Sequence, residues 1–259
     1  MIVPFDEPLP DSRHMKAEDI QQALQRLASP SKAKSSSWFF RTGPGQYGEG
    51  DQFIGVTVPE QREVAASFAS ISLLELMRLL QSPIHEHRLT ALFILVDQYK
   101  KGDTQIKKEI VGLYHKNRAQ VNNWDLVDSS APYILGDWLL THSPEVLYRL
   151  ASSKSVWDRR IAIIATLASI KNNQFDPTLK IATLLLPDKE DLIHKATGWA
   201  LREVGKKDQK TLINFLDRHA KSMPRTSLRY AIERLSTQQR LYYLKQKTSG
   251  KQGLRKEDQ

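Results

Sequence analysis

Apolar residues recur at spacings of three and four along most of the chain beyond residue 60, and strand-like alternation of apolar and polar residues is rare. Polar breaks separate these segments, for example at Ser82-Pro83, Gly102-Asp103 and Asn172-Asn173. Between the breaks, each segment has room for a helix of about 10 to 17 residues, a usual length in helical domains. The pattern therefore predicts an all-α protein.

Residues typical of helix N-termini stand where several of these segments begin. Pro59-Glu60 and Asp188-Lys189-Glu190 provide an early proline or acids, which the positive end of a helix dipole favours. Asn122 or Asn123 can cap the helix that follows it. These positions predict helices beginning near residues 59, 124 and 188–190.

Similar segments recur at intervals of 34 to 36 residues and carry, at matching positions, Arg88, Trp124, Arg160, Lys195 and Arg229. Two helices fill each interval, which is typical of an α-solenoid. Because the repeats are divergent, we describe them as HEAT-like. Such a stack curves, so we expect a concave groove along which Trp124, Arg160 and Lys195 lie.

The repeats also suggest how the chain is divided. We expect an N-terminal extension and a first helix in residues 1–30, and a single domain of HEAT-like helical repeats in residues 31–245. Residues 246–259 form a polar tail that we expect to be disordered, because its composition cannot support a core.

Composition excludes several classes of protein. The chain has no cysteine, so disulfides, cysteine nucleophiles and thiolate metal sites are excluded. Its longest strongly apolar stretches, such as residues 91–96, are far too short to span a bilayer, and its first residues lack the pattern of a signal peptide. We therefore expect a cytoplasmic protein that has no membrane partner.

Positive charge is concentrated near the C-terminus. Lys and Arg outnumber Asp and Glu by 8 in residues 181–259, out of a net charge of +9 for the whole chain. Clustered Lys and Arg release counterions when they neutralise phosphates, so this distribution favours a polyanion as the partner. The expected groove would then be basic.

Two short motifs do not carry the functions that they superficially match. GPGQYG at 43–48 fits G-x-G-x-x-G, but a dinucleotide fingerprint requires a preceding strand and a following helix. Pro44 removes an amide donor, and more glycines follow in GEGDQFIG. We expect a mobile loop there, with a glycine-rich backbone able to approach phosphates. His85-Glu86-His87 places its histidines two residues apart, on different sides of a helix, which makes a metal site unfavourable. A solvated helix start is expected there instead.

The stretch NNWDLVD at 122–128 places an aromatic residue and a carboxylate one helical turn apart. Trp124 and Asp128 therefore share one face of the predicted helix. They can serve as a packed tryptophan and an ion-paired acid, or as a functional surface. Trp199 and Arg160 fall near corresponding positions of later repeats and favour the second interpretation, whereas Trp157 is expected in the core.

At these residues the chain resembles the AlkD-type DNA alkylation repair glycosylases, a family built from HEAT-like repeats. The resemblance extends over about residues 35–235 and is carried by the segments at 43–60, 85–96, 122–136, 157–163 and 195–203 (GPGQYGEGDQFIGVTVPE, HEHRLTALFILV, NNWDLVDSSAPYILG, WDRRIAI and KATGWALRE). It implies a lesion site formed by Trp124, Asp128, Arg160 and Trp199.

The resemblance also implies an activity. It predicts a monomeric DNA glycosylase that needs no cofactor or metal and removes 7-methylguanine and 3-methyladenine from duplex DNA, without flipping the base. Alkylation makes these bases cationic, so they leave as neutral molecules, and a carboxylate can stabilise the positive charge left on the deoxyribose. We expect the enzyme to be associated with the nucleoid, with further DNA contacts from Gly45, Tyr47, Arg88, Arg159, Lys195 and Arg202.

Two other functions are compatible with the same helices. A non-catalytic paralogue would bind unusual or branched DNA through the basic groove and would have Asp128 paired away from it. A protein-binding scaffold would have an apolar, uncharged concave face. The presence of all four lesion-site residues favours the enzyme.

Overall fold

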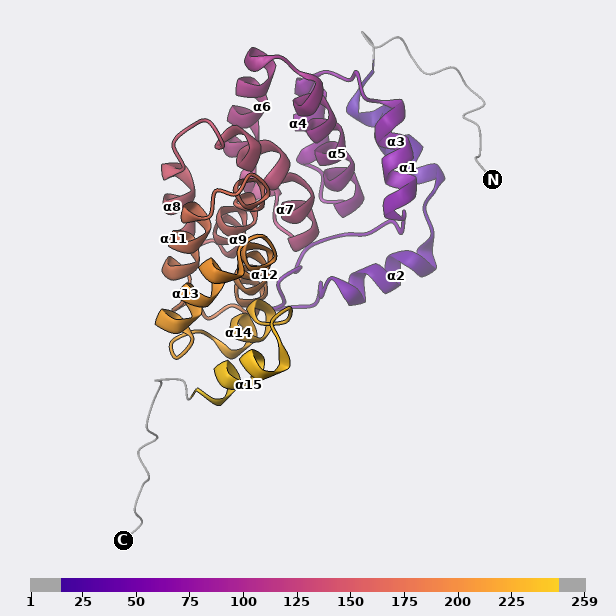
Figure 1. Ribbon diagram of the computed structural model, residues 1–259. Coiled ribbons are helices and arrows are strands. Elements are labelled where there is room, and N and C mark those ends of the chain that lie inside the picture. The colour runs from indigo at the N-terminus through magenta and orange to yellow at the C-terminus, as the bar shows by residue number, and fades with distance from the viewer. Residues whose placement is uncertain (1–14, 247–259) are drawn as a thin grey trace. The chain divides into compact units, whose positions relative to one another are not determined.

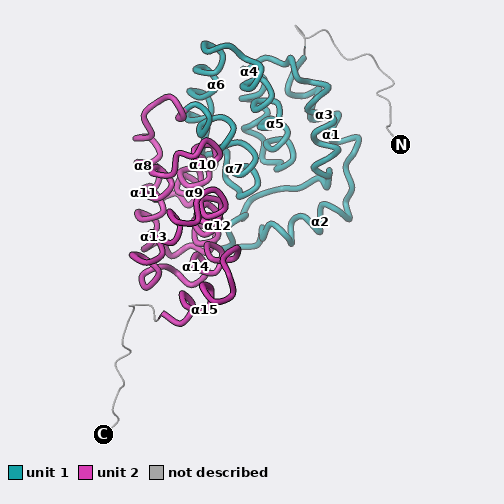
Figure 2. Tube along the Cα trace, in the orientation of Figure 1, with its two compact units in different colours: residues 1–138 teal, residues 139–259 magenta. Residues whose placement is uncertain are grey.

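The computed structural model describes residues 15–246 and divides the chain into two compact units, residues 1–138 and 139–259 (Figures 1 and 2). All the regular secondary structure in the described residues is helical, and the only extended pairing there is an isolated bridge between Gln52 and Ile84. The prediction of an all-α protein is confirmed. The first 14 residues and most of the predicted tail, residues 247–259, lie outside the described range.

The first unit is organised around α5, whose first twelve residues are all buried. This helix packs against α3, α4 and α7, and α1 packs against α3 and α4. The helices of this unit are α1 (Ala17–Arg26), α2 (Pro30–Phe39), α3 (Val58–Ser67), α4 (Leu73–Leu80), α5 (His85–Lys101), α6 (Thr104–Lys116), the 3₁₀ turn η1 (Arg118–Gln120), α7 (Trp124–Ser130) and the π turn η2 (Pro132–Gly136).

The second unit has α12 at its centre. This helix packs against α9, α13 and α14, and Gly198 allows the closest approach, because a Cβ atom there would lie 2.5 Å from the backbone oxygen of Ser227 in α14. The helices of this unit are α8 (Glu145–Ala151), α9 (Val156–Ala165), α10 (Leu167–Lys171), α11 (Asp176–Leu184), α12 (Asp191–Lys207), α13 (Gln209–His219), α14 (Arg225–Ala231) and α15 (Thr237–Lys245).

The helices begin close to where the sequence predicts. Asn123 caps α7, Glu190 precedes α12, and α3 begins at Val58 with a capping box between Thr57 and Glu60. Successive helices pack on one another within each unit, as in an α-solenoid. None of the helices in the described part of the chain combines the length and apolarity needed to cross a bilayer.

Helix α7 changes its geometry one turn after Asp128. Pro132 has no N–H to donate to the carbonyl of Asp128, and its ring would clash with that carbonyl in a regular helix. The chain instead forms the π turn η2, in which the N–H of Gly136 bonds to the carbonyl of Ala131 at 2.8 Å. Single π turns often occur beside functional residues, so this change of geometry makes α7 a candidate location for a functional site.

Candidate functional site

The start of α7 carries the candidate site of the first unit. The side-chain oxygen of Asn123 accepts the backbone N–H of Trp124 at 2.8 Å and fixes the first turn of the helix. Trp124 and Asp128 are both partly exposed and lie one turn apart on the same face. An aromatic ring and a carboxylate therefore share an accessible surface of this unit.

An aromatic cluster supports Trp124 from one side. Its indole stacks on the ring of Phe40, with centroids 5.4 Å apart and planes inclined by 18°. Phe39, at the end of α2, meets the indole edge-on at 6.0 Å. Phe40 also stacks on Phe53 at 5.0 Å and contacts the imidazole of His85 at 4.9 Å. These rings were not predicted from the sequence as part of the site.

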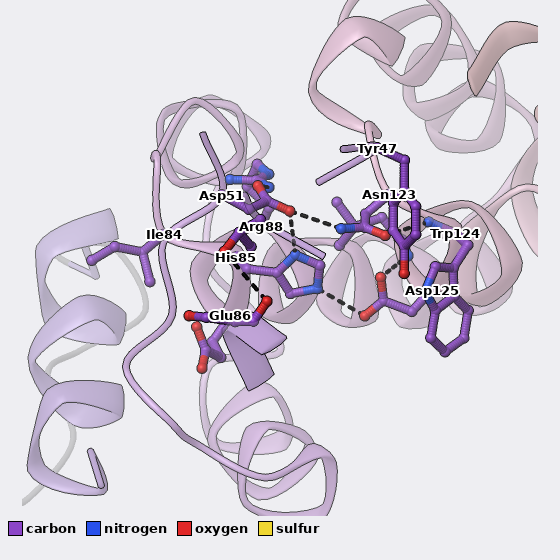
Figure 3. A network of polar contacts seen from close by, with 12 residues as sticks. Tyr47, Asp51, Ile84, His85, Glu86, Arg88, Asn123, Trp124 and Asp125 are labelled. Carbon is purple, nitrogen blue, oxygen red and sulfur yellow. Dashed lines mark hydrogen bonds and ion pairs between the residues drawn. The ribbon is translucent and has the colours of Figure 1, made fainter. Parts of the chain in front are cut away.

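A polar network also supports this turn (Figure 3). The two ring nitrogens of His85 lie 3.1 Å from a carboxylate oxygen of Asp51 and 2.8 Å from one of Asp125. Asp51 also accepts a hydrogen bond from the side-chain amide of Asn123 at 2.8 Å and is ion-paired with Arg88. Both sequence neighbours of Trp124 are thus bonded to this network.

The interpretation of residues 85–87 as a solvated helix start is wrong. His85, Glu86 and His87 are 2%, 2% and 4% exposed, respectively. Glu86 accepts backbone N–H groups from three consecutive residues, Ile54 at 3.1 Å, Gly55 at 2.8 Å and Val56 at 3.4 Å. These polar residues are buried because they provide hydrogen bonds to a loop that has no secondary structure of its own.

Charge within the network is balanced. Burial lowers the pKa of His85, but hydrogen bonds and attraction from Asp125 and Asp51 outweigh this and raise it to about 9. Burial raises the pKa of Asp51, yet the bond to His85 and the charge of Arg88 leave it below its ordinary value. At neutral pH an imidazolium therefore bridges two carboxylates. No group of three or more His, Asp or Glu within residues 15–246 is arranged as a metal site.

The protonation of His85 predicts how stability depends on pH. Because its pKa is about 9 in the folded state and 6.5 ordinarily, its contribution is complete below pH 6.5 and is lost as the pH rises to 9. The shift corresponds to roughly 3 kcal/mol. Urea unfolding of the wild type and of His85→Gln should give a difference in unfolding free energy that narrows over this range. A difference independent of pH would contradict this assignment.

The glycine-rich loop, which spans residues 41–52, is anchored on both sides of its tip. A Cβ atom at Gly48 would lie 2.3 Å from the backbone oxygen of Phe40, so only glycine fits beneath the aromatic cluster. Gly45 is exposed, has a φ of +72° and donates its N–H to Glu49 at 2.9 Å. The hydroxyl of Tyr47 lies 3.4 Å from the backbone oxygen of Phe39. Helix α2 precedes the loop, so its surroundings differ from those of a dinucleotide fingerprint.

Arg88 and Arg159 are engaged with carboxylates inside their own units. Arg88 is 2% exposed and also donates to the backbone oxygen of Ser82 at 2.9 Å. The Nε of Arg159 donates to Asp188 at 2.6 Å, where the carboxylate side chain is 4% exposed. Both guanidiniums are thus held in internal ion pairs. Their predicted contacts with DNA would require these internal ion pairs to open.

The second unit places its candidate residues on α9 and α12. Arg160 is 5% exposed and donates to the backbone oxygen of Leu192 at 2.8 Å, joining the two helices. Trp199 is partly exposed, and its indole N–H bonds to Glu203 at 3.1 Å. Trp157, predicted to lie in the core, is only partly buried.

One side of α12 combines basic and aromatic side chains. Lys195, Trp199 and Arg202 follow one another at spacings of four and three residues and so lie along one face. Lys195 is exposed and pairs with Asp191 at 2.8 Å, and Arg202 pairs with Glu233. The pair of Lys195 with Asp191 is solvent-exposed, and such pairs contribute little stability.

The helical architecture defines an all-α protein of stacked helices, and sequence comparison assigns its family. A model of the DNA alkylation repair enzyme family matches residues 20–235, so the chain belongs to this family and has a role in DNA repair. The match begins within α1, whereas the resemblance was expected to begin near residue 35.

The fold is shared with a protein of known structure. The chain resembles a predicted DNA alkylation repair enzyme from Enterococcus faecalis with a TM-score of 0.65 and 17% identity, over 81% of this chain and 97% of that one. At this level of identity the likeness supports the fold alone. No curated protein sequence matches the chain significantly.

Proposed function

We propose that the protein is a DNA glycosylase that hydrolyses the N-glycosidic bond of cationic alkylated purines in duplex DNA. The observation that carries the proposal is that Trp124 and Asp128 lie one turn apart on a partly exposed face of α7, in a chain that belongs to a DNA alkylation repair family. The substrates would be 7-methylguanine and 3-methyladenine.

The chemistry of these substrates matches the residues of α7. Alkylation at N7 of guanine or N3 of adenine weakens the glycosidic bond, and the base leaves neutral without prior protonation by an acid. Positive charge then develops on the deoxyribose. The carboxylate of Asp128 would stabilise that charge and orient the attacking water, while the face of Trp124 would contact the sugar and the cationic base.

The resemblance assigns two residues of the second unit to the same reaction. Trp199 would provide another electron-rich face. Arg160 is buried, so it would hold the phosphate beside the lesion only if its bond to the backbone oxygen of Leu192 opened. Lys195 and Arg202 share a face of α12 with Trp199 and would contact neighbouring phosphates. The damaged base would stay stacked in the duplex, because contacts with the DNA backbone suit a solenoid surface.

The activity is tested with a duplex that carries one 7-methylguanine. Incubation with the protein should produce abasic sites, detected as strand breaks after alkali treatment, above the background of spontaneous depurination. An unmodified duplex of the same sequence serves as the control. Tight binding with no abasic sites would support the non-catalytic binder of unusual DNA instead.

Binding to undamaged duplex should depend steeply on salt. Phosphate contacts from Arg160, Lys195 and Arg202 would displace condensed counterions, so affinity should fall as the salt concentration rises from low to moderate. Arg160→Ala should weaken binding to all sequences alike. Fluorescence anisotropy measures the affinities. Since Arg160 also joins α9 to α12, the unfolding midpoint of the variant has to be measured as well. An interaction insensitive to salt would contradict DNA as the partner.

A further inference from the structure

We propose that His85 is a positioning residue for base release, which fixes the indole of Trp124 by linking the glycine-rich loop to both neighbours of that tryptophan. The inference rests on the proposed glycosylase activity. It concerns a buried side chain within the first unit, which the sequence resemblance did not assign to the lesion site.

The first connection from His85 to Trp124 consists of hydrogen bonds (Figure 3). One ring nitrogen of His85 is bonded to Asp125, which follows Trp124 directly. The other is bonded to Asp51, which accepts the side-chain amide of Asn123, the residue that caps the Trp124 N–H. Displacement of the imidazole would therefore free Asp125 directly and remove one of the partners that hold Asp51, to which Asn123 is bonded.

The second connection consists of stacked rings. Phe40 touches His85 at 4.9 Å and Trp124 at 5.4 Å, so a single phenyl ring lies against both. Phe53 stacks on His85 at 4.6 Å and on Phe40 at 5.0 Å. His85 therefore contacts the rings against which the indole packs, in addition to its hydrogen bond to Asp125 at the start of α7.

The same histidine anchors the loop to α5. The backbone N–H of His85 donates to the carbonyl of Gln52 at 2.8 Å, next to Asp51 in sequence. Glu86, the following residue, binds the N–H groups of residues 54–56. Displacement of the glycine-rich loop, which is predicted to approach DNA, would therefore move the partner of His85 and, through it, the start of α7.

Few side chains can replace an imidazolium in this place. It has two N–H donors on opposite sides of a rigid ring, and it bridges carboxylates that lie 34 and 40 residues away in sequence. A glutamine can place its amide near the nitrogen that faces Asp125, and an asparagine can reach only toward Asp51. His85→Gln and His85→Asn therefore each keep one connection and break the other.

His87 provides a matched control on the same helix. It is as deeply buried as His85, and its ring bonds to the hydroxyl of Ser82 at 2.9 Å, outside the network. His87→Gln makes the same replacement two residues away, but on a neutral ring, because burial and the charge of Arg88 lower the pKa of His87 to about 4. If burial of a histidine in α5 were all that mattered, the two substitutions would affect base release equally.

The experiment measures base release from the 7-methylguanine duplex with saturating protein, well below the unfolding midpoint of each variant. Both His85 variants should release the base roughly 10- to 100-fold more slowly, the usual effect of a misplaced contact group. Their affinity for undamaged duplex should be nearly unchanged, and His87→Gln should match the wild-type rate. A folded His85 variant with the wild-type rate would overturn the proposal.

A second measurement does not depend on catalysis. Protein labelled with 5-fluorotryptophan gives one ¹⁹F resonance for Trp124, assigned by its loss in Trp124→Phe. His85→Gln should shift or broaden this resonance, and His87→Gln should leave it in place. An unchanged resonance in His85→Gln would refute the positioning role even if the wild type releases no base. If the His85 variants do not fold, Asp125→Asn is measured in the same two ways, with the same expected and contradictory results.

Discussion

Replacement of Asp128 by asparagine should slow the release of 7-methylguanine by roughly 10²-fold or more, the usual effect of removing one preorganised electrostatic group. The carboxylate would act on charge that is present only in the transition state, so affinity for undamaged duplex should stay nearly the same. Single-turnover rates and anisotropy measure the two quantities separately.

Two further substitutions test whether the effect on base release is specific to the carboxylate of Asp128. Asp97→Asn makes the same chemical change on an exposed carboxylate of α5 that pairs with Lys101, and it should leave the rate unchanged. Trp124→Ala removes contact area as well as electrostatic help, so it should weaken both binding and base release. A wild-type rate of base release from Asp128→Asn would refute the role assigned to this residue.

Replacement of Glu86 by alanine should lower the free energy of unfolding by roughly 3 to 5 kcal/mol. Its carboxylate accepts the N–H groups of Ile54, Gly55 and Val56, and the substitution would leave them without this partner in a largely buried site. Equilibrium urea unfolding provides the measurement. Glu63→Ala changes an exposed glutamate of α3 and should stay within about 0.5 kcal/mol of the wild type. Equal effects of the two substitutions would contradict this role of Glu86.

Much of the fold is predictable from local sequence patterns. The apolar spacing of three and four is sufficient to identify the helices, and capping residues such as Asn123 and Thr57 mark where they begin. Pro132 and Gly102 mark where regular helix gives way. These features depend on residues close together in sequence, so reading the chain in order recovers them.

The buried polar network was not predictable in the same way. Three adjacent ionisable residues at 85–87 ordinarily indicate a solvated turn, because burying charge without partners is costly. The partners of His85 and Glu86 are Asp51, Asp125 and the amides of residues 54–56, which lie 30 or more residues away in sequence. No local spacing reveals such pairs. One signal was present: Phe39, Phe40 and Phe53 flank the glycine-rich loop, which indicates packing there.

The sequence also did not predict which basic residues are buried in ion pairs and which are exposed. Arg88 and Lys195 occupy matching positions of the repeat, yet the structure buries the first against Asp51 and exposes the second. Arg88 is buried because Asp51, which is 37 residues away in sequence, provides a carboxylate partner for it. Trp124 and Asp128, by contrast, are one turn apart on one helix, so their shared face followed directly from their spacing.

The fate of the methyl group tests the proposed activity most directly. The wild-type protein is incubated with a duplex whose 7-methylguanine carries an isotopically labelled methyl group, and the products are separated by chromatography. We predict that the label leaves the DNA as free 7-methylguanine and that an equal amount of abasic sites appears. Label that stays in intact DNA, or that leaves while guanine is restored in the strand, would contradict hydrolysis of the glycosidic bond.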